Sequence, residues 1–344
     1  MRILIATPLE PELAAAIAAV DPRAQVDYVP DLVPPPLYPC DHRGDPAWRR
    51  DRLAEQRWNG LLARADVLLG IPGERPEALV EAPALGPHVR WVQCMFAGAG
   101  EQVRAARLDA ATLARVAFTS AAGVHATMLT EFVFLGLLAL RKDFRRLEAI
   151  RAARTWPHFP SGELAGGVMC IVGMGGIGTA VACAARAFGM RIVAVTRDGR
   201  TQPDADDVYA IAQLGEAVAR ADAVVVTLPG TAATNGLVSA AVIAAMPRSA
   251  IFCNVGRGTV VDQDALVAAL AARRIAGAVL DVFDPEPLPP EHPLWTLENV
   301  VFSPHTMALS LRENERIVAL FCDNLRRFSA SEPLRNRIDP LEFY

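Results

Sequence analysis

The stretch that decides the fold is VMCIVGMGGIGTAVACAARAFGMRIVAV, residues 168–195. An apolar run at 168–172 leads into a glycine-rich turn. An alanine-rich segment at 177–188 and a second apolar run at 192–195 follow. This order is typical of a strand, a tight turn, a helix and a second strand parallel to the first. The stretch therefore predicts a βαβ unit of an open parallel sheet.

Three glycines in the turn have the spacing GxGxxG: Gly173, Gly175 and Gly178. The first permits the tight turn, the second lets the main chain approach a pyrophosphate, and the third lets the helix pack closely on the strand. The phosphates would meet the first N–H groups of the helix, which include those of Gly176 and Ile177. Because the glycines stand in a full βαβ context, they predict a dinucleotide-binding site.

The end of the second strand bears on which dinucleotide binds. An acidic residue about 20 residues beyond the turn would bind the adenosine ribose 2′-hydroxyl of NAD. This chain has Thr196 and Arg197 there. A neutral residue does not repel a 2′-phosphate, and Arg197 and Arg200 offer it cations, so we expect NADP to be favoured over NAD. The alternative is that both arginines are solvated and Asp198 binds NAD.

The rest of the chain repeats the alternation of strands and helices. Its 344 residues suit two domains of about 100–200 residues each. The apolar runs expected to form strands are Arg2–Ala6, Ala65–Gly70, Val89–Cys94, Val116–Thr119, Val168–Val172, Ile192–Val195, Ala223–Thr227, Ala250–Val255, Gly277–Leu280 and Val300–Ser303. The expected helices are Glu10–Val20, Met128–Ala153, Ile177–Phe188, Leu214–Arg220, Gln263–Arg273 and Leu309–Phe328. The pattern predicts an α/β fold with parallel sheets.

Composition excludes several classes of function. A net charge of -4 and a pI near 5.9 provide no basic field for nucleic acid. No apolar run is long enough to span a membrane. The six cysteines have neither a disulfide framework nor a metal-ligand spacing. We therefore expect a cytoplasmic protein with reduced thiols, no bound metal and no nucleic-acid or membrane partner.

Three further segments each follow an expected strand and bring in reactive side chains. NVGRGTVVDQDAL (254–266) contains Arg257, LDVFDPEPLPPEHPLW (280–295) contains Asp281 and Glu286, and FSPHTMALS (302–310) contains His305. Open α/β sheets bind ligands beyond the carboxyl ends of their strands. With the glycine motif and LPGTAATNGLV (228–238), these segments resemble the D-isomer-specific 2-hydroxyacid dehydrogenase family, from about Trp91 to about Ser310.

The resemblance implies an architecture and an activity. A Rossmann-type, doubly wound cofactor domain (123–305) would be inserted in a flavodoxin-like substrate domain (1–122 and 306–344). The enzyme would transfer a hydride between NAD(P)H and C2 of a small 2-oxo or 2-hydroxy acid, the sole partner expected apart from a second copy in a homodimer. The proline-rich segment 28–48 is expected to be an ordered loop, packed on a neighbouring subunit, on the rim of the substrate cleft, or simply on the surface.

The resemblance also implies a role for individual residues. His305 would be the acid/base, with its imidazole oriented by Glu286, and Arg257 would hold the substrate's carboxylate and carbonyl oxygens. Asp281 would fix the nicotinamide carboxamide. In WVQCMFAGAGEQV (91–103), the main chain of Ala97 and Gly98 would bind the substrate carboxylate. The remaining residues assigned to the cofactor are Leu228, Pro229, Thr234 and Val255.

Other readings of the same motifs stay open. Related formate dehydrogenases carry glutamine in place of Glu286, so the carboxylate here favours proton-coupled chemistry. Related transcriptional corepressors bind the dinucleotide with little turnover and can retain the same residues. A phosphoglycerate-type enzyme would need a regulatory domain, for which the residues after Phe328 leave no room. Met95 and Phe96 are bulkier than the residues usual in the family, so the substrate's side chain stays undetermined.

Overall fold

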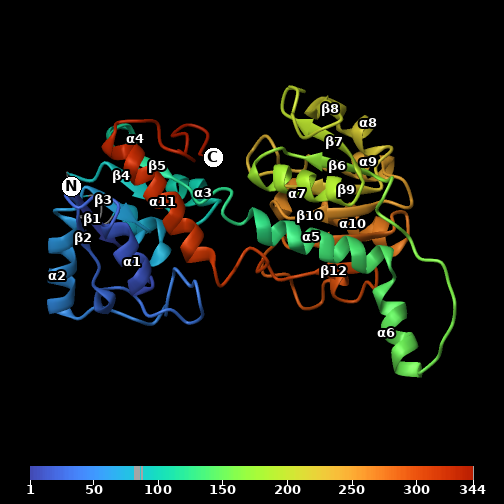
Figure 1. The fold of residues 1–344 in the computed structure, drawn as a ribbon, viewed down its shortest axis with the longest axis horizontal. Helices are drawn as coiled ribbons and strands as arrows, with labels where there is room; N and C mark the ends of the chain where they lie inside the picture. The colour runs from blue at the N-terminus through green and yellow to red at the C-terminus, as the bar shows by residue number, and fades with distance from the viewer. Residues whose placement is uncertain (81–85, 87, 344) are drawn as a thin grey trace. The chain divides into compact units, whose positions relative to one another are not determined.

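The computed structural model of the protein describes residues 1–80, 86 and 88–343, which divide into two compact units. Unit 1 comprises residues 1–125 and 309–344, and unit 2 comprises residues 126–308 (Figure 1). The sequence placed the domain boundaries after residues 122 and 305, and the units divide after His125 and Ala308. None of the described helices is both long and apolar enough to cross a membrane.

Unit 1 is built on a parallel sheet of five strands in the order β2-β1-β3-β4-β5, which is the flavodoxin-like order. The strands are β1 (Arg2–Ile5), β2 (Gln25–Asp27), β3 (Val67–Leu69), β4 (Trp91–Gln93) and β5 (Ala117–Thr119). The helices are α1 (Pro11–Ala18), α2 (Arg52–Leu62), α3 (Ala99–Ala105), α4 (Ala110–Arg115) and α11 (Glu313–Ser329). Residues of α1 and α11 pack on one face of the sheet, and residues of α2 and α3 pack on the other.

Unit 2 contains a parallel sheet of seven strands in the order β12-β11-β10-β9-β6-β7-β8. The strands are β6 (Val168–Val172), β7 (Arg191–Thr196), β8 (Asp207–Ala210), β9 (Ala223–Val226), β10 (Ile251–Asn254), β11 (Gly277–Leu280) and β12 (Val300–Phe302). Counted from β6, this is the Rossmann order with a seventh strand added beyond β11. The fold class predicted from the sequence is confirmed for both units.

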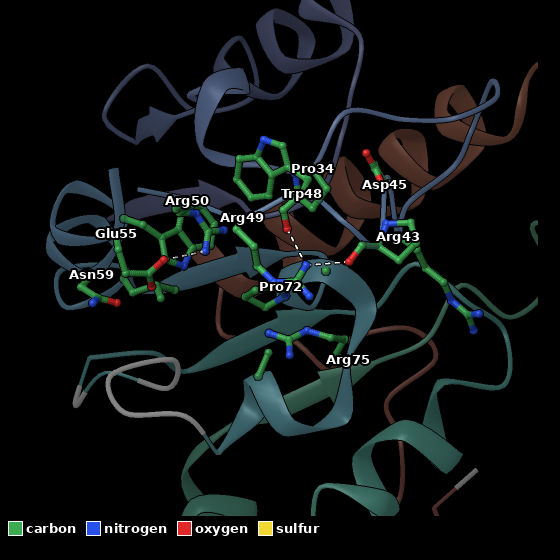
Figure 2. A pocket seen from close by; sticks show the side chains of 16 residues that line it. Pro34, Arg43, Asp45, Trp48, Arg49, Arg50, Glu55, Asn59, Pro72 and Arg75 are labelled. Atoms are coloured by element: carbon green, nitrogen blue, oxygen red, sulfur yellow. Dashed lines mark hydrogen bonds and ion pairs between the residues drawn. The ribbon is translucent and has the colours of Figure 1, made fainter. Parts of the chain in front are cut away.

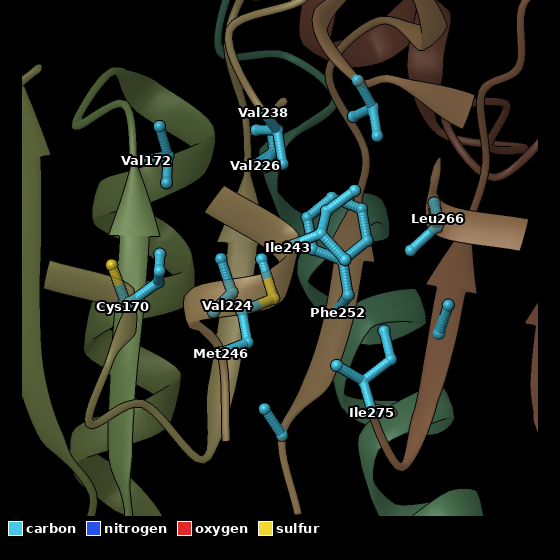
Figure 3. Packing of buried hydrophobic residues seen from close by; sticks show 14 of the residues in the cluster. Cys170, Val172, Val224, Val226, Val238, Ile243, Met246, Phe252, Leu266 and Ile275 are labelled. Carbon is cyan, nitrogen blue, oxygen red and sulfur yellow. The ribbon is translucent and has the colours of Figure 1, made fainter. Parts of the chain in front are cut away.

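Helices cover both faces of the unit 2 sheet. The helices of unit 2 are α5 (Ala126–Arg141), α6 (Phe144–Ala153), α7 (Gly176–Ala187), α8 (Leu214–Val218), α9 (Ala240–Ala245) and α10 (Gln263–Ala271), and α6 alone among them does not pack on the sheet. Residues of α5 and α7 pack on one face, and residues of α8, α9 and α10 pack on the other. On the second face Phe252 of β10 is fully buried among side chains that include Val224, Ile243 and Met246 (Figure 3). This packing holds in place the strands whose carboxyl ends lead into the candidate site residues.

The sequence predicted one helix over Met128–Ala153, and this prediction is wrong in one respect. The helix is interrupted after Arg141, and Asp143 adopts a left-handed conformation with φ 50°. The Asp143 side chain accepts a hydrogen bond from the N–H of Arg146 at 3.3 Å and so caps a new helix, α6. No residue of α6 is buried, and Figure 1 shows α6 leading away from the sheet of unit 2.

The proline-rich segment contains no strand and only one short 3₁₀ turn, Pro30–Leu32. All six cysteines are free thiols, as expected from their spacing. Five of them are buried, and Cys183 on α7 is exposed.

Candidate active site

The glycine-rich turn lies between β6 and α7, at the carboxyl edge of the unit 2 sheet. A Cβ at Gly178 would lie 2.0 Å from the carbonyl oxygen of Gly173, so the packing of α7 on the strand requires glycine there. Gly175 differs, because its φ is -76° and a Cβ would meet nothing within 4 Å. Nothing in the protein requires glycine at 175. The open space suits a ligand group that approaches the main chain closely.

The first turn of α7 suits an anion. The helix begins at Gly176, and no side chain caps its N-terminus. Its first N–H groups, including those of Gly176 and Ile177, therefore have no partner within the helix and point toward the glycine turn. These residues fit the pyrophosphate of a dinucleotide.

The end of β7 holds the residues that bear on the dinucleotide's ribose. The Oγ1 of Thr196 accepts a hydrogen bond from the N–H of Gly199 at 3.1 Å. Asp198 and Arg200 form an ion pair, with Oδ2 and Nε 2.7 Å apart. The ion pair occupies the carboxylate of Asp198, which would bind NAD. It also occupies Arg200, one of the two arginines expected to bind a 2′-phosphate. Arg197, the other of these two arginines, is exposed at the strand end.

Asp281 follows β11 and is buried. Its Oδ1 accepts hydrogen bonds from the hydroxyl of Ser303 and from the N–H groups of Thr306 and Met307, at 3.1 and 3.2 Å. Burial raises the pKa of Asp281, and these hydrogen bonds oppose the rise without cancelling it. The carboxylate thereby fastens the end of β11 to the loop that carries His305. This bonding was not predicted from the sequence, since it depends on Ser303 and on two main-chain donors.

Arg257 lies in a tight turn after β10 that Asn254 organises. Asn254 is buried; its Oδ1 accepts from the N–H of Gly256 at 3.0 Å, and its Nδ2 donates to the carbonyl of Arg257 at 3.0 Å. The Nη1 of Arg257 donates to the carbonyl of Gly256 at 2.8 Å. Sequence reasoning missed Asn254. An asparagine closing an apolar strand (IFCN) is the signal that could have found it.

His305 and Glu286 lie in direct contact. The Nδ1 of His305 lies 2.7 Å from Oε2 of Glu286, and both side chains are partly exposed, at 39% and 35%. The other carboxylate oxygen, Oε1, accepts a hydrogen bond from the N–H of Phe283 at 2.9 Å. One oxygen of Glu286 is thus anchored to its own loop while the other orients the imidazole. Because Nδ1 is engaged, Nε2 is the ring nitrogen that a substrate can reach.

His305 lies in a tight turn of its own. It has a left-handed φ of 52°, and its N–H donates to the carbonyl of Ser303 at 3.0 Å.

Among the cofactor residues implied by the resemblance, Thr234 holds its own turn by donating from Oγ1 to the carbonyl of Pro229 at 2.7 Å. The side chain of Leu228 packs against Gly173. Val255, which directly follows β10, is buried. These residues all follow strands of the one parallel sheet.

The two remaining predicted residues belong to unit 1. Ala97 and Gly98 follow β4 and precede α3; Ala97 is exposed and Gly98 is half-buried. Within the described part of the chain, neither main-chain N–H donates a hydrogen bond. The two groups therefore suit a carboxylate acceptor. No cluster of three or more histidine, cysteine or acidic side chains that could hold a metal is present among the described residues.

Several known proteins are similar in sequence to this chain. Residues 134–307, half of the chain, match the family profile described as D-isomer specific 2-hydroxyacid dehydrogenase, NAD binding domain. A protein described as uncharacterized, in the proB 3′ region of Corynebacterium melassecola, is 34% identical over 274 residues, covering 77% of this chain and 86% of the relative. A glyoxylate reductase of Korarchaeum cryptofilum is 36% identical over 230 residues, covering 64% and 69%.

Among solved structures, a D-isomer specific 2-hydroxyacid dehydrogenase from Xanthobacter autotrophicus Py2, in complex with NADPH and MES, superposes with a TM-score of 0.75. It is 26% identical, and the match covers 100% of this chain and 99% of that one. The profile match, the sequence relatives and the fold agree. The chain therefore belongs to the D-isomer specific 2-hydroxyacid dehydrogenase family, whose members are NAD(P)-dependent oxidoreductases.

Proposed function

We propose that the protein reduces small 2-oxo acids at C2, and oxidises the corresponding 2-hydroxy acids, with His305 as the acid/base. The observation that carries this proposal is the 2.7 Å contact between His305 and a Glu286 that is itself anchored to Phe283. When bound, the nicotinamide cofactor supplies or accepts the hydride at C2. The protein's own residues must then supply the proton and hold the substrate.

In the direction of reduction, the Nε2–H of protonated His305 donates a proton to the carbonyl oxygen as that oxygen gains charge. Glu286 keeps the ring in one orientation through its contact with Nδ1. In oxidation, neutral Nε2 accepts the hydroxyl proton instead. A carboxylate at position 286 is useful only where a proton moves with the hydride, which favours hydroxy-acid chemistry over the oxidation of formate.

Arg257 is proposed to hold the substrate's carboxylate and carbonyl oxygens, because a planar guanidinium fork matches two acceptors in one plane. The bonds from Asn254 and Gly256 fix the turn from which it extends. We assign the N–H groups of Ala97 and Gly98 to the substrate carboxylate as well. The nicotinamide carboxamide is assigned to Asp281, whose carboxylate is held in place by Ser303 and by the N–H groups of Thr306 and Met307.

For the cofactor we propose NADP in preference to NAD, with Gly173 to Gly178 at the pyrophosphate and Thr196 and Arg197 at the ribose. Leu228, Pro229, Thr234 and Val255 would line the rest of the dinucleotide. The NADPH named for the Xanthobacter autotrophicus structure supports this choice. The glyoxylate reductase relative supports a small substrate.

We also propose a homodimer. Phe144 and Leu147 of α6, and Trp156 just beyond it, are exposed large apolar side chains on an element without a buried residue. Apolar side chains gathered in this way are typical of a surface that a second chain covers. Light scattering of the wild type and of Phe144→Asp with Leu147→Asp tests this, with a monomeric wild type contradicting it.

The deciding experiment is a panel of 2-oxo acids, including glyoxylate, hydroxypyruvate and pyruvate, assayed with NADPH and with NADH. We expect turnover that His305→Ala lowers by about 10²–10⁴. Dinucleotide binding without turnover of any acid would contradict the proposal and support the alternative, a corepressor-like protein that senses the dinucleotide.

A further inference from the structure

The proline-rich loop, residues 28–48, is tied internally so that the main chain at Arg43 has a fixed course. Asp41 accepts hydrogen bonds from the N–H groups of Leu37, Arg43 and Gly44, at 3.0, 3.1 and 3.1 Å. Gly44 has φ 67°, and a Cβ there would lie 2.5 Å from the Cβ of Pro34. The loop therefore cannot shift at this point without breaking several contacts at once.

The loop contacts the turn that follows β4. The buried ring of His42 packs edge-on against Phe96, with centroids 5.8 Å apart and an interplanar angle of 72°. The guanidinium carbon of Arg43 lies 5.7 Å from the centroid of the same phenyl ring. Phe96 directly precedes Ala97 and Gly98. An exposed cation thus lies beside the turn to which the proposed function assigns the substrate carboxylate.

No carboxylate of the described residues neutralises the positive charge of Arg43. No carboxylate of the described residues lies within ion-pair distance of its guanidinium, and Asp41 is engaged by main-chain N–H groups. Glu74 lies close enough for the charge of Arg43 to lower its pKa, but burial outweighs this and raises the pKa of Glu74 to about 8. Near neutral pH, Glu74 is therefore mostly uncharged and does not neutralise Arg43.

Two arginines just after the loop make different contacts. Like Arg43, Arg49 and Arg50 line a cavity of about 500 Å³ (Figure 2). Arg49 donates to the carbonyls of Pro46 and Trp48 at 2.6 and 2.7 Å. Arg50 lies over the Trp58 ring at 4.2 Å and donates to the carbonyl of Leu32 at 2.7 Å. These two guanidinium groups thus contact main-chain carbonyls and the Trp58 ring, whereas the guanidinium of Arg43 lies over the Phe96 ring.

We propose that Arg43 binds a second anionic group on the substrate, so that the preferred substrates are 2-oxo acids whose side chain ends in an anion such as a carboxylate. The inference rests on the proposed function, because it requires the C1 carboxylate on the turn of Ala97 and Gly98. Phe96 then forms an apolar wall beside the methylene groups between the two charges. The guanidinium fork offers the distal anion two parallel hydrogen bonds.

The test compares matched substrates that differ only in the distal charge. These are 2-oxoglutarate against 2-oxopentanoate, and oxaloacetate against 2-oxobutanoate. We expect wild-type kcat/KM to be higher for the anionic member of each pair. Arg43→Ala should lower that value about tenfold or more for the anionic acids and leave the neutral-chain acids nearly unchanged, since a hydrogen bond between charged groups is lost. Arg43→Gln keeps the side-chain stem and should behave like Arg43→Ala.

Arg49→Ala is the control, since it removes one positive charge just after the loop and should leave the ratio within each pair unchanged. Thermal unfolding of all three variants checks that the loop remains folded. Turnover of glyoxylate without a preference for anionic side chains, or an equal effect of Arg43→Ala on both members of a pair, overturns the inference alone. Failure to turn over any 2-oxo acid overturns the proposed function and the inference together.

Discussion

The imidazole Nδ1 of His305 and the Oε2 of Glu286 lie 2.7 Å apart. They come from loops that follow β12 and β11, adjacent strands of one parallel sheet. The second carboxylate oxygen is held by the main chain of Phe283, so the orientation of the pair is set by the loop and not by the substrate.

Replacement of His305 by alanine should therefore remove the proton transfer and leave cofactor binding nearly intact. We expect kcat to fall by about 10²–10⁴ while the Kd for NADPH changes little. Glu286→Gln keeps the shape of the side chain and should cause a smaller loss. Steady-state kinetics and a fluorescence titration of NADPH measure both effects. Wild-type turnover in His305→Ala would remove this residue from the mechanism.

Arg257 is expected to contact the substrate in the ground state and in the transition state. Arg257→Ala should therefore raise KM for the 2-oxo acid and lower kcat together. Arg257→Lys retains the charge but loses the planar fork, and it should recover only part of the activity. An unchanged kcat/KM in Arg257→Ala would show that this side chain does not bind the substrate.

Two alanine substitutions in the glycine turn should separate cofactor binding from folding. A Cβ at Gly175 meets nothing in the protein, so Gly175→Ala should keep the wild-type Tm without cofactor but bind NADPH at least about tenfold more weakly, since the pyrophosphate would meet the added methyl group. A Cβ at Gly178 would collide with main chain, so Gly178→Ala should lower the stability by about 1–3 kcal/mol. Calorimetric unfolding and NADPH titration distinguish them. Full NADPH affinity in Gly175→Ala would place the pyrophosphate elsewhere.

The cofactor preference is expected to depend on Arg197. Arg197→Ala should raise KM for NADPH about tenfold more than KM for NADH, if a bond of about 1.5 kcal/mol to the 2′-phosphate is lost. Arg200→Ala is the comparison, because it removes a second cation near the same strand end, one that forms an ion pair with Asp198. Equal effects of Arg197→Ala on the two cofactors would contradict the preference for NADP.

Glu313 should govern part of the acid stability. Burial alone would raise its pKa, but hydrogen bonds from His125 and His42 and their charges outweigh burial and lower it to about 2. A carboxylate with a depressed pKa stabilises the folded state above its ordinary pKa of 4.5, and this contribution disappears as the pH falls toward about 2. Glu313→Gln should cost about 1.5–3 kcal/mol at neutral pH.

The difference between wild type and Glu313→Gln should therefore shrink as the pH falls through this window. Urea unfolding at several pH values measures it, with Glu332→Gln, at an exposed position, as the control. A constant difference across the window would show that the charge of Glu313 is not what stabilises the fold.

The strongly apolar strands could be predicted from the sequence because each is buried on both faces, as β6 and β9 to β11 are. The sequence did not predict β2 and β8, two of the four edge strands, which mix polar and apolar residues and contain no buried residue. It also missed α2, a largely polar helix in which Trp58, Leu61 and Leu62 are the buried residues. The local amino-acid composition of these segments does not distinguish them from loops, because their structure depends on contacts with other parts of the fold.

The site residues could be named because short motifs carry them and each motif follows a strand. The supporting residues could not, since their roles depend on contacts that folding creates. His42 and Glu313 are 271 positions apart, and no spacing rule connects them. Asn254 and Ser303 likewise show their function only once the strand ends are adjacent.

Cys183 is the one exposed cysteine among the six free thiols. Thiol labelling can therefore report the unfolding of the protein without an added probe. Burial holds the other thiols inaccessible and, at Cys170, raises the pKa to about 12, which leaves almost no reactive thiolate. A maleimide should therefore add a single adduct to the native protein and six to the denatured chain. Intermediate adduct masses, resolved by peptide mapping, would report which sheet opens first.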